Sequence, residues 1–353
     1  MTADFKIWMI IWIPLLCSCG DNAPEISIVA EENGVGNSII KWEISPMTQG
    51  NVKVYASTDP DNIPMNDPVA VAPIDDNRLT VIPPSPHKRY YYKLVFDDRY
   101  TKTAANRNLS VNGIQNFRDL GGYRSTHKHK HVKWGRLYRS GRIDSLSQYS
   151  MKEMKNIGIR TVVDLRTADE LNHSKPLQAS FNRIHIPISL ERIDEVVNNI
   201  QKGVLRGDTI RTILEQINED LVIKNLNEYS LLMKTLLNEE NYPIVIQGHS
   251  GRSRTGIVSA IILAALGVDH ETILEDYQLS NRYNDLCTEQ SFAFQLPDYC
   301  QEAITIALSA KKSFLNAARN QIYTSYGNMD NFMNEGLGLT DDDIDKLRSL
   351  LLE

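Results

Sequence analysis

The sequence predicts an α/β domain with a central, mostly parallel sheet flanked by helices, preceded by a small all-β sandwich. Three observations support this prediction. Up to residue 108, short alternating apolar and polar runs are separated by clusters of Pro, Gly, Asn and Asp, which is typical of strands and turns. Beyond it, short β-branched runs alternate with longer helix-like segments, as in a parallel sheet covered by helices. The 353 residues are enough for two domains.

Composition and charge limit the class of protein. The chain is 42% hydrophobic and 23% charged, which is ordinary for a globular protein with a sizeable core. Its net charge of −6 does not favour nucleic acid as a partner. The sequence contains no dinucleotide-binding glycine motif, no Walker loop and no zinc-ligand spacing, so we predict no cofactor and no metal.

The N-terminus is predicted to be an export signal. Lys6 precedes an apolar run at 7–16, which has the length of a secretory core segment and is too short to span a bilayer. The segment that follows resembles a bacterial lipobox, with residues 1–18 as signal peptide and Cys19 as the lipidated first residue. Cys17 is a poorer candidate because Leu16 before it is large. We therefore expect an exported bacterial lipoprotein anchored to a membrane on its periplasmic or outer surface; cleavage nearby without a lipid is the alternative.

Two further cysteines, Cys287 and Cys300, remain in the mature chain. Export permits a disulfide between them. The sequence does not say whether their Cα atoms come close enough, so two free buried thiols are an equal alternative.

Residues 19–108 are predicted to form the sandwich. Candidate strands are 26–29, 38–44, 52–55, 79–82 and 90–96. An early Trp42 and a late Tyr-rich strand resemble a fibronectin type III or immunoglobulin-like domain. We expect such a domain to serve as a spacer between the membrane and the rest of the protein.

Local signals predict the elements of residues 109–353. Ser147 caps a helix whose apolar residues share one face, and Gly158 ends it. Residues 159–165, 184–187 and 244–246 are the candidate strands. The segment at about 190–240 is helix-like; an ordinary covering helix explains it, and the family resemblance described below implies instead that part of it is a lid over the pocket. Residues 340–343 cap a last helix that reaches Leu352.

The stretch at 243–256 is the most informative of the chain. A short apolar run leads into a loop rich in Gly and Ser, and the loop enters an apolar helix that stops at Gly267. A strand, loop and helix N-terminus in this order direct several backbone N–H groups and the positive end of the helix dipole at one point. Arg254 adds a planar, bidentate guanidinium. The stretch therefore predicts a phosphate-binding loop made of Gly248, His249, Ser250, Gly251, Arg252, Ser253 and Arg254.

This loop resembles the signature His-Cys-x-x-x-x-x-Arg-Thr-Gly of cysteine-dependent phosphatases. Asn-Phe-Arg-Asp-Leu-Gly-Gly at 116–122, the segments at 134–141 and 157–167, and those at 276–281 and 336–340 follow in the order found in the bacterial tyrosine/serine protein phosphatases. The chain departs from the signature at three positions. Gln247 replaces the His, Gly248 replaces the nucleophilic Cys, and Ser253 replaces the acid that often precedes the Arg.

The resemblance implies a two-step reaction through a phosphocysteine, which this loop cannot perform with Gly248. Loss of a nucleophile costs on the order of 10⁶ in turnover. His249 and Ser250 are possible substitutes, but neither is in register. Arg254 is the retained catalytic residue, and Asp119 or Asp164 could be a residual acid, although a structural carboxylate bonded to Arg118 or Arg166 is the other interpretation.

Two further groups of residues need an interpretation. His127, His129 and His131 alternate, as metal ligands on one strand face could, but a solvated basic turn is the interpretation we favour. Arg136, Arg139 and Arg142 either line the pocket or pair with acidic neighbours.

The predicted function is binding of phosphate or of a phosphorylated protein or small molecule by a tyrosine or dual-specificity phosphatase domain with little or no turnover. One alternative is an active phosphatase with an unorthodox nucleophile. The other is a non-catalytic scaffolding or binding lipoprotein.

Overall fold

The computed structural model describes residues 23–33, 35–85, 88–144, 146–172, 174, 181–190, 192–205, 207–284 and 297–353. The predicted signal segment, Cys19 and Cys287 lie outside this set. Cys300 is a buried free thiol. Within the described residues, no helix has the length and apolar character needed to cross a membrane.

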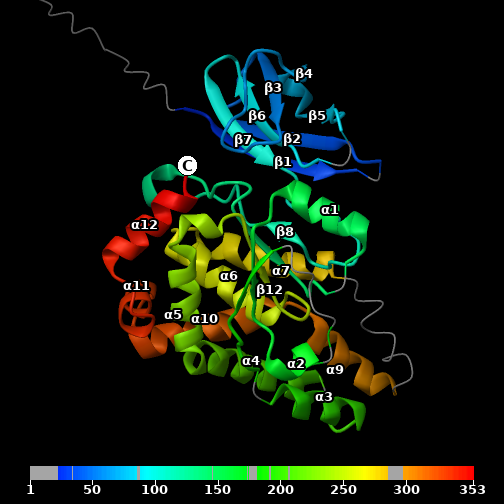
Figure 1. Ribbon diagram of the computed structural model, residues 1–353, viewed down its shortest axis with the longest axis vertical. Coiled ribbons are helices and arrows are strands. Elements are labelled where there is room, and N and C mark those ends of the chain that lie inside the picture. Colours follow the sequence, from blue (N-terminus) through cyan, green and yellow to red (C-terminus); the bar gives the residue numbers. More distant parts are fainter. Residues whose placement is uncertain are drawn as a thin grey trace, which may run out of the picture.

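The N-terminal part is a sandwich of two antiparallel sheets (Figure 1). One sheet has the order β1 (Glu25–Glu32), β2 (Ser38–Ser45) and β5 (Arg78–Val81). The other has the order β4 (Ala70–Pro73), β3 (Asn51–Ser57), β6 (Tyr91–Phe96) and β7 (Tyr100–Ala105). The predicted strands are all present. Sequence inspection missed β4, which is short, and β7, which follows β6 directly through a tight turn.

Trp42 lies at the centre of the sandwich core. Its ring packs edge-on against Phe96, with ring centroids 6.0 Å apart. Its indole N–H donates to the backbone oxygen of Ile74 at 2.8 Å, so the buried polar atom is satisfied. The tryptophan that suggested a sandwich from the sequence is thus one of the residues that join its two sheets.

The second part contains a five-stranded sheet in the order β11 (Asn182–His185), β10 (Thr161–Asp164), β12 (Ile244–Gln247), β9 (Leu137–Ser140) and β8 (Arg118–Asp119). The first four strands are parallel, and only β8 runs antiparallel to its neighbour β9. The predicted mostly parallel sheet is therefore confirmed. β12 occupies the middle, which places the end of this strand at the centre of one sheet edge.

Alternate residues of the central strands face two different cores. Val162 and Val245 pack with α1 (Gln148–Ile157) on one face. Val163 and Ile246 pack on the other face with α6 (Ser253–Ala265) and α5 (Leu226–Leu236). Because both faces are covered, the strands are β-branched and continuous, as the sequence indicated. Ser147 caps α1 and Gly158 ends it in the left-handed conformation, as predicted.

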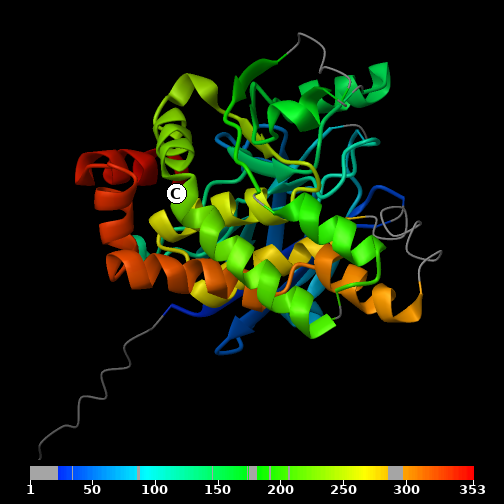
Figure 2. The same cartoon turned by 90° about the horizontal axis from the view of Figure 1, so that it is seen from below.

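The remaining helices surround this sheet (Figures 1 and 2). They are α2 (Ala168–Asn172), α3 (Ile193–Gln201), α4 (Gly207–Lys224), α7 (His270–Tyr283), α9 (Asp298–Leu308), α10 (Lys312–Tyr326), α11 (Met329–Asn331) and α12 (Asp341–Leu351). The region at 190–240 consists of α3, α4 and α5. In the view from below, α4 runs beside α10, and its residues Leu221 and Val222 join the main core. Thr340 and Asp343 form the capping box of α12.

The sandwich packs directly on the second part of the chain. Arg89, only 5% exposed, donates to the carboxylate of Asp119 at 2.6 Å. Its guanidinium also lies 5.0 Å and 5.4 Å from the ring centroids of Tyr91 and Tyr138, whose hydroxyls are 3.2 Å apart. Trp134 completes an apolar cluster with sandwich residues. This junction is a buried, polar and aromatic interface.

Replacement of Arg89 by Met should destabilise the full chain by about 3–5 kcal/mol, because Asp119 would be left buried without its ion-pair partner. The matched control is Lys41→Met, which breaks an exposed pair with Glu31 in the same sandwich. Its effect should stay within about 1 kcal/mol. Chemical denaturation of both variants checks this; equal losses would contradict the importance of the Arg89 contact.

Candidate functional site

The predicted phosphate loop lies at the junction of a strand and a helix. Gln247 ends β12, residues 248–252 form the loop, and Ser253 begins α6. Within the described chain, no acceptor is found for the backbone N–H groups of Ser250, Gly251, Ser253, Arg254 and Thr255. Unused amides at the start of a long, buried helix are what an anion requires. The predicted strand-to-helix position of the loop is confirmed.

Gly251 allows the loop to turn against the neighbouring strand. Its φ is +69°, which favours glycine, and an added Cβ would stand 2.6 Å from the backbone carbonyl carbon of Ser140. A side chain at this position would therefore push the loop away from β9.

Two side chains hold the loop through its carbonyl oxygens. The amide nitrogen of Asn116 donates to the oxygens of Gly251 and Ser250, at 2.9 Å and 3.2 Å. Arg139 donates to the oxygen of Gly251 at 2.7 Å. In a peptide unit the C=O and N–H groups point in opposite directions. The hydrogen bonds to the loop carbonyls therefore also fix the direction of the loop N–H groups. Asn116 and Arg139 thus orient the cradle.

A buried ion cluster supports these two residues. Asp276 of α7 accepts from Arg139 at 2.7 Å and from Arg118 at 3.1 Å, and none of the three is more than 2% exposed at its side chain. Burial alone would raise the pKa of Asp276, but the two guanidinium groups outweigh it and hold the pKa far below its usual range. Burial, together with the charge of Arg118, lowers the pKa of Arg139 to about 10. Arg139 therefore pairs with an acidic neighbour, one of the two roles left open by the sequence.

Arg254 is held by Glu170 of α2, a residue that the sequence did not single out. Nη1 and Nη2 of Arg254 donate to the two carboxylate oxygens of Glu170, each at 2.6 Å. Nη1 also donates to the backbone oxygens of Leu165 and Ile188. The Nε edge of the guanidinium has no acceptor among the described residues. That edge remains for a bound anion.

The ion pair with Arg254 lowers the pKa of the Glu170 carboxyl group. Burial would raise the pKa of Glu170, but hydrogen bonds and charge from Arg254, with the amide of Thr167, lower it to about 2. His249 lies on the same side, with Nδ1 3.8 Å from Glu170 and a side chain that is 56% exposed.

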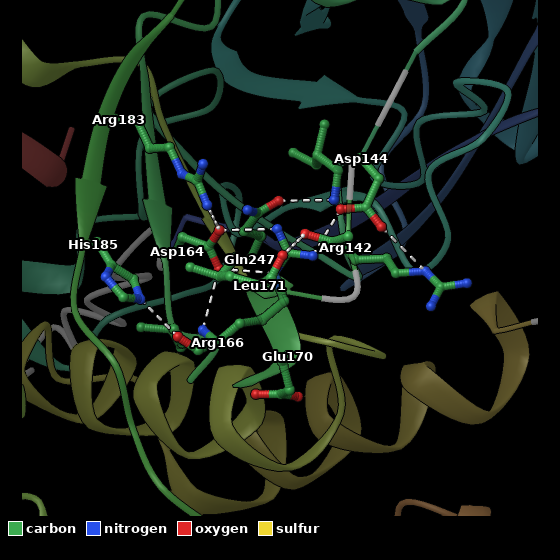
Figure 3. Close-up of polar contacts among 12 residues, drawn as sticks. Arg142, Asp144, Asp164, Arg166, Glu170, Leu171, Arg183, His185 and Gln247 are labelled. Atoms are coloured by element: carbon green, nitrogen blue, oxygen red, sulfur yellow. Dashed lines mark hydrogen bonds and ion pairs between the residues drawn. The ribbon is translucent and has the colours of Figure 1, made fainter. Parts of the chain in front are cut away.

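A side chain at position 248 would press against Thr255. Apart from the residues next to Gly248 in the chain, an added Cβ would meet one atom within 4 Å, the hydroxyl oxygen of Thr255 at 2.7 Å, which would have to shift. Thr255 is 1% exposed, and its hydroxyl has no partner in the described part of the chain. Gln247, at the His position of the signature, accepts from the amide of Ile143 at 2.8 Å (Figure 3).

The geometry gives no support to a catalytic role for Asp119. The carboxylate is fully buried, and its oxygens accept from the amides of Gly121 and Gly135 and from Arg89. Burial raises its pKa, with partial compensation from Arg89, which by itself would suit a general acid. Without exposure, however, the carboxylate cannot reach a ligand at the loop. The alternative partner named from sequence, Arg118, is also not its partner; Arg89 is.

Asp164 has the structural role that the sequence favoured. It accepts from Arg166 at 2.9 Å and from Arg183 at 2.7 Å, and Figure 3 shows its carboxylate between these two guanidinium groups. Arg166 also binds Asp144 at 2.7 Å. Arg142 is 59% exposed and lies 3.6 Å from Asp144, while Arg136 pairs with Asp61 of the sandwich.

The alternating histidines form part of a surface turn. His127 and His129 lie in a short 3-10 turn, and His131 in an isolated bridge to Arg124. Among the described residues, no group of three or more His, Cys, Asp and Glu is placed to hold a metal ion.

A family model described as "Tyrosine phosphatase family" matches residues 109–353. The chain belongs to this family. The match covers the parallel sheet, the loop and the helices around it, and it leaves the sandwich outside.

Two curated phosphatases are similar to this chain over most of their own length. A putative tyrosine-protein phosphatase of Cupriavidus necator is 26% identical over 65% of this chain and 84% of its own. The triple specificity protein phosphatase PtpB of Mycobacterium tuberculosis is 22% identical over 68% of this chain and 97% of its own. Among solved structures, TpbA of P. aeruginosa is 17% identical, covers 50% of this chain and 90% of its own, and has a TM-score of 0.25.

Replacement of Gly251 by Ala should weaken phosphate binding at least about tenfold, or 1.4 kcal/mol, because the Cβ displaces the loop from Ser140. Gly338→Ala is the matched control. Its φ is +63°, but an added Cβ meets nothing within 4 Å. It should cost about 1–2 kcal/mol of stability and no phosphate affinity. Calorimetric titration with inorganic phosphate compares the two, and equal affinities would contradict the loop geometry.

The Arg254–Glu170 pair should make a pH-dependent contribution to stability. Because the folded-state pKa of Glu170 is depressed to about 2 from 4.5, its contribution is complete above about pH 5 and is lost as pH falls towards 2. The shift corresponds to on the order of 3 kcal/mol. The difference in unfolding free energy between the wild type and Glu170→Gln should therefore be constant from pH 7 to 5 and shrink below 4.5. A difference that stays constant from pH 7 down to pH 2 would show that this pKa is not lowered in the folded protein.

Proposed function

We propose that this domain binds phosphate and phosphomonoesters at residues 248–254 and performs little or no phosphocysteine chemistry. The observation that carries the proposal is the contrast at the loop. The unused amides, the helix start and the free edge of Arg254 are all in place, whereas the position of the attacking sulfur is Gly248.

Physical chemistry separates binding from turnover at such a site. A phosphomonoester carries a charge of about −1.5 to −2 at pH 7 and offers three acceptor oxygens, which the amides and guanidinium of this loop match. Hydrolysis in this family's manner also needs a thiolate that forms a bond to phosphorus. Two carboxylates that could act as a residual acid or base are engaged: Glu170 by Arg254, and Asp164 by Arg166.

The ligand class follows from the same features. A phosphorylated protein or small molecule meets the chemical requirement, and the P. aeruginosa TpbA structure in complex with pTyr shows one such ligand in a similar protein. We further propose that the chain is an exported lipoprotein attached to a membrane through Cys19. The support is the apolar run at 7–16 and the lipobox-like residues that follow it.

The test is phosphomonoester hydrolysis by the wild type, Gly248→Cys and Gly248→Ser. The wild type should bind inorganic phosphate and show turnover at background. Gly248→Cys should raise turnover by at least about 10²-fold, since the nucleophile is the largest missing contribution. Gly248→Ser is the matched control, because it adds a side chain of similar size with a much weaker nucleophile, and it should not gain activity.

Two results would overturn the proposal. Wild-type hydrolysis at the rate of the Cys variant would show that another residue serves as nucleophile. Failure of the wild type to bind phosphate, or binding that Arg254→Lys leaves unchanged, would show that the loop has no anion-binding function.

A further inference from the structure

We propose that a cavity beside α6 is a binding site for a short fatty acid, a molecule with a straight apolar chain of about eight carbons and one carboxylate. The walls of the cavity come from α4, α6, α7, α10 and α11. Helices α4 and α10 run side by side across this part of the molecule (Figure 2). The inference does not rest on the proposed function, because the cavity is separate from the loop at residues 248–254.

Small side chains on two neighbouring helices create the cavity. The apolar lining residues of α6 and α10 recur at helical spacing: Ile257, Ala260, Ile261 and Ala264 of α6, and Leu315 and Ala318 of α10. The side chains of the three alanines end at Cβ, so the helices do not fill the space between them. A cavity of about 200 Å³ remains.

The interior of this cavity favours an apolar occupant over water. A buried water needs two to four polar partners, and an apolar cavity of about 150 Å³ stays dry and accepts a benzene molecule. The polar side chains in the lining are His270, Arg319 and Tyr323. Of these, His270 is already engaged, since its Nε2 lies 2.8 Å from the side-chain oxygen of Asn316. A flexible hydrocarbon chain matches the remaining aliphatic walls.

Arg319 and Tyr323 stand where the cavity meets solvent. Tyr323 is 37% exposed and Arg319 is half-buried. The guanidinium of Arg319 lies 4.3 Å from the centroid of the Tyr323 ring, which restricts its position. In the part of the chain that the structure describes, Arg319 has no ion-pair or hydrogen-bond partner besides this ring contact. The cavity therefore has one unpaired cation at its entrance.

One guanidinium beside an apolar cavity matches one carboxylate on an apolar chain. A guanidinium donates two parallel N–H groups to a carboxylate, which gives this pairing both strength and direction. The chain would then replace water along the faces of α6 and α10. Each further CH₂ that the cavity buries should raise the affinity about fourfold, so octanoate should bind about 15-fold more tightly than hexanoate.

The experiment titrates the full chain with octanoate, hexanoate and 1-octanol in a buffer without phosphate. Heat of binding and the unfolding midpoint are the readouts, because a ligand of the folded state raises the midpoint in a saturable manner. Octanoate should bind 1:1 and more tightly than 1-octanol by about three- to tenfold, since only octanoate pairs with Arg319.

Three variants assign the binding to the cavity. Ala260→Leu fills the space and should abolish binding of octanoate and 1-octanol, while the midpoint without ligand stays equal or rises. Arg319→Met should lower the octanoate affinity to that of 1-octanol and leave 1-octanol unchanged. Arg211→Met is the matched control, because Arg211 is an exposed arginine of α4 outside the lining. It should keep the full preference for octanoate.

Two results would overturn the inference. The first is the absence of saturable octanoate binding to the wild type, or binding that Ala260→Leu leaves unchanged. The second is a preference for octanoate over 1-octanol that persists in Arg319→Met. Phosphate binding at residues 248–254 is measured in a separate titration, so failure of the cavity site and failure of the proposed function are distinguishable.

Discussion

The ion cluster of Arg118, Arg139 and Asp276 is the interaction on which the loop depends. Two buried guanidinium groups share one buried carboxylate, and each also reaches a partner that holds the loop. Arg139 binds the oxygen of Gly251 directly, and Arg118 donates to the side-chain oxygen of Asn116, whose amide nitrogen binds the same carbonyl. Because Asn116 and Arg139 hold the loop carbonyls on one side, the backbone N–H groups of the loop point to the opposite side. A buried pair of this kind is a costly way to gain stability, which agrees with a role in orientation.

Under the proposed function, this arrangement explains how the loop forms without a sulfur at residue 248. Residue 248 adds a backbone hydrogen bond to the oxygen of Ser140, at 3.3 Å. Side chains hold the loop at Gly251 and Ser250 on one side, and Glu170 holds Arg254 on the other. The loop conformation is therefore set by the fold, whereas bond formation to phosphorus would be set by a single side chain. Under the proposed function, glycine at position 248 leaves the anion-binding geometry of the loop in place. The buried hydroxyl of Thr255 has no hydrogen-bond partner among the described residues.

The sequence was informative where the physics is local. The loop, the caps of α1 and α12 and the β-branched strands each depend on neighbouring residues, so their patterns are readable. The contacts that position the site are not local. Glu170 is 84 residues from Arg254, and Asp276 is 137 residues from Arg139. Nothing in the sequence around Glu170 predicts that it pairs with Arg254. Asp276 was easier to single out, because it lies in one of the segments that resemble the family.

Contacts between residues far apart in the chain also explain why the sequence did not predict the role of Asp119 or its contact with the sandwich. Asp119 lies in the motif at 116–122, which made a catalytic role plausible, but its partner Arg89 belongs to the other domain and could not be anticipated. Because Asp119 follows Arg118 directly, the sandwich interface and the loop support are adjacent in the chain. The N-terminal domain therefore bears on the segment that carries Asn116 and Arg118, and is more than a spacer in the structural sense.

The most direct measurement is a calorimetric titration of the wild-type chain with phosphotyrosine, followed by analysis of the recovered ligand. The account predicts a saturable 1:1 heat and recovery of the ester intact. Absence of binding, or release of inorganic phosphate at the rates of cysteine-dependent relatives, would contradict it.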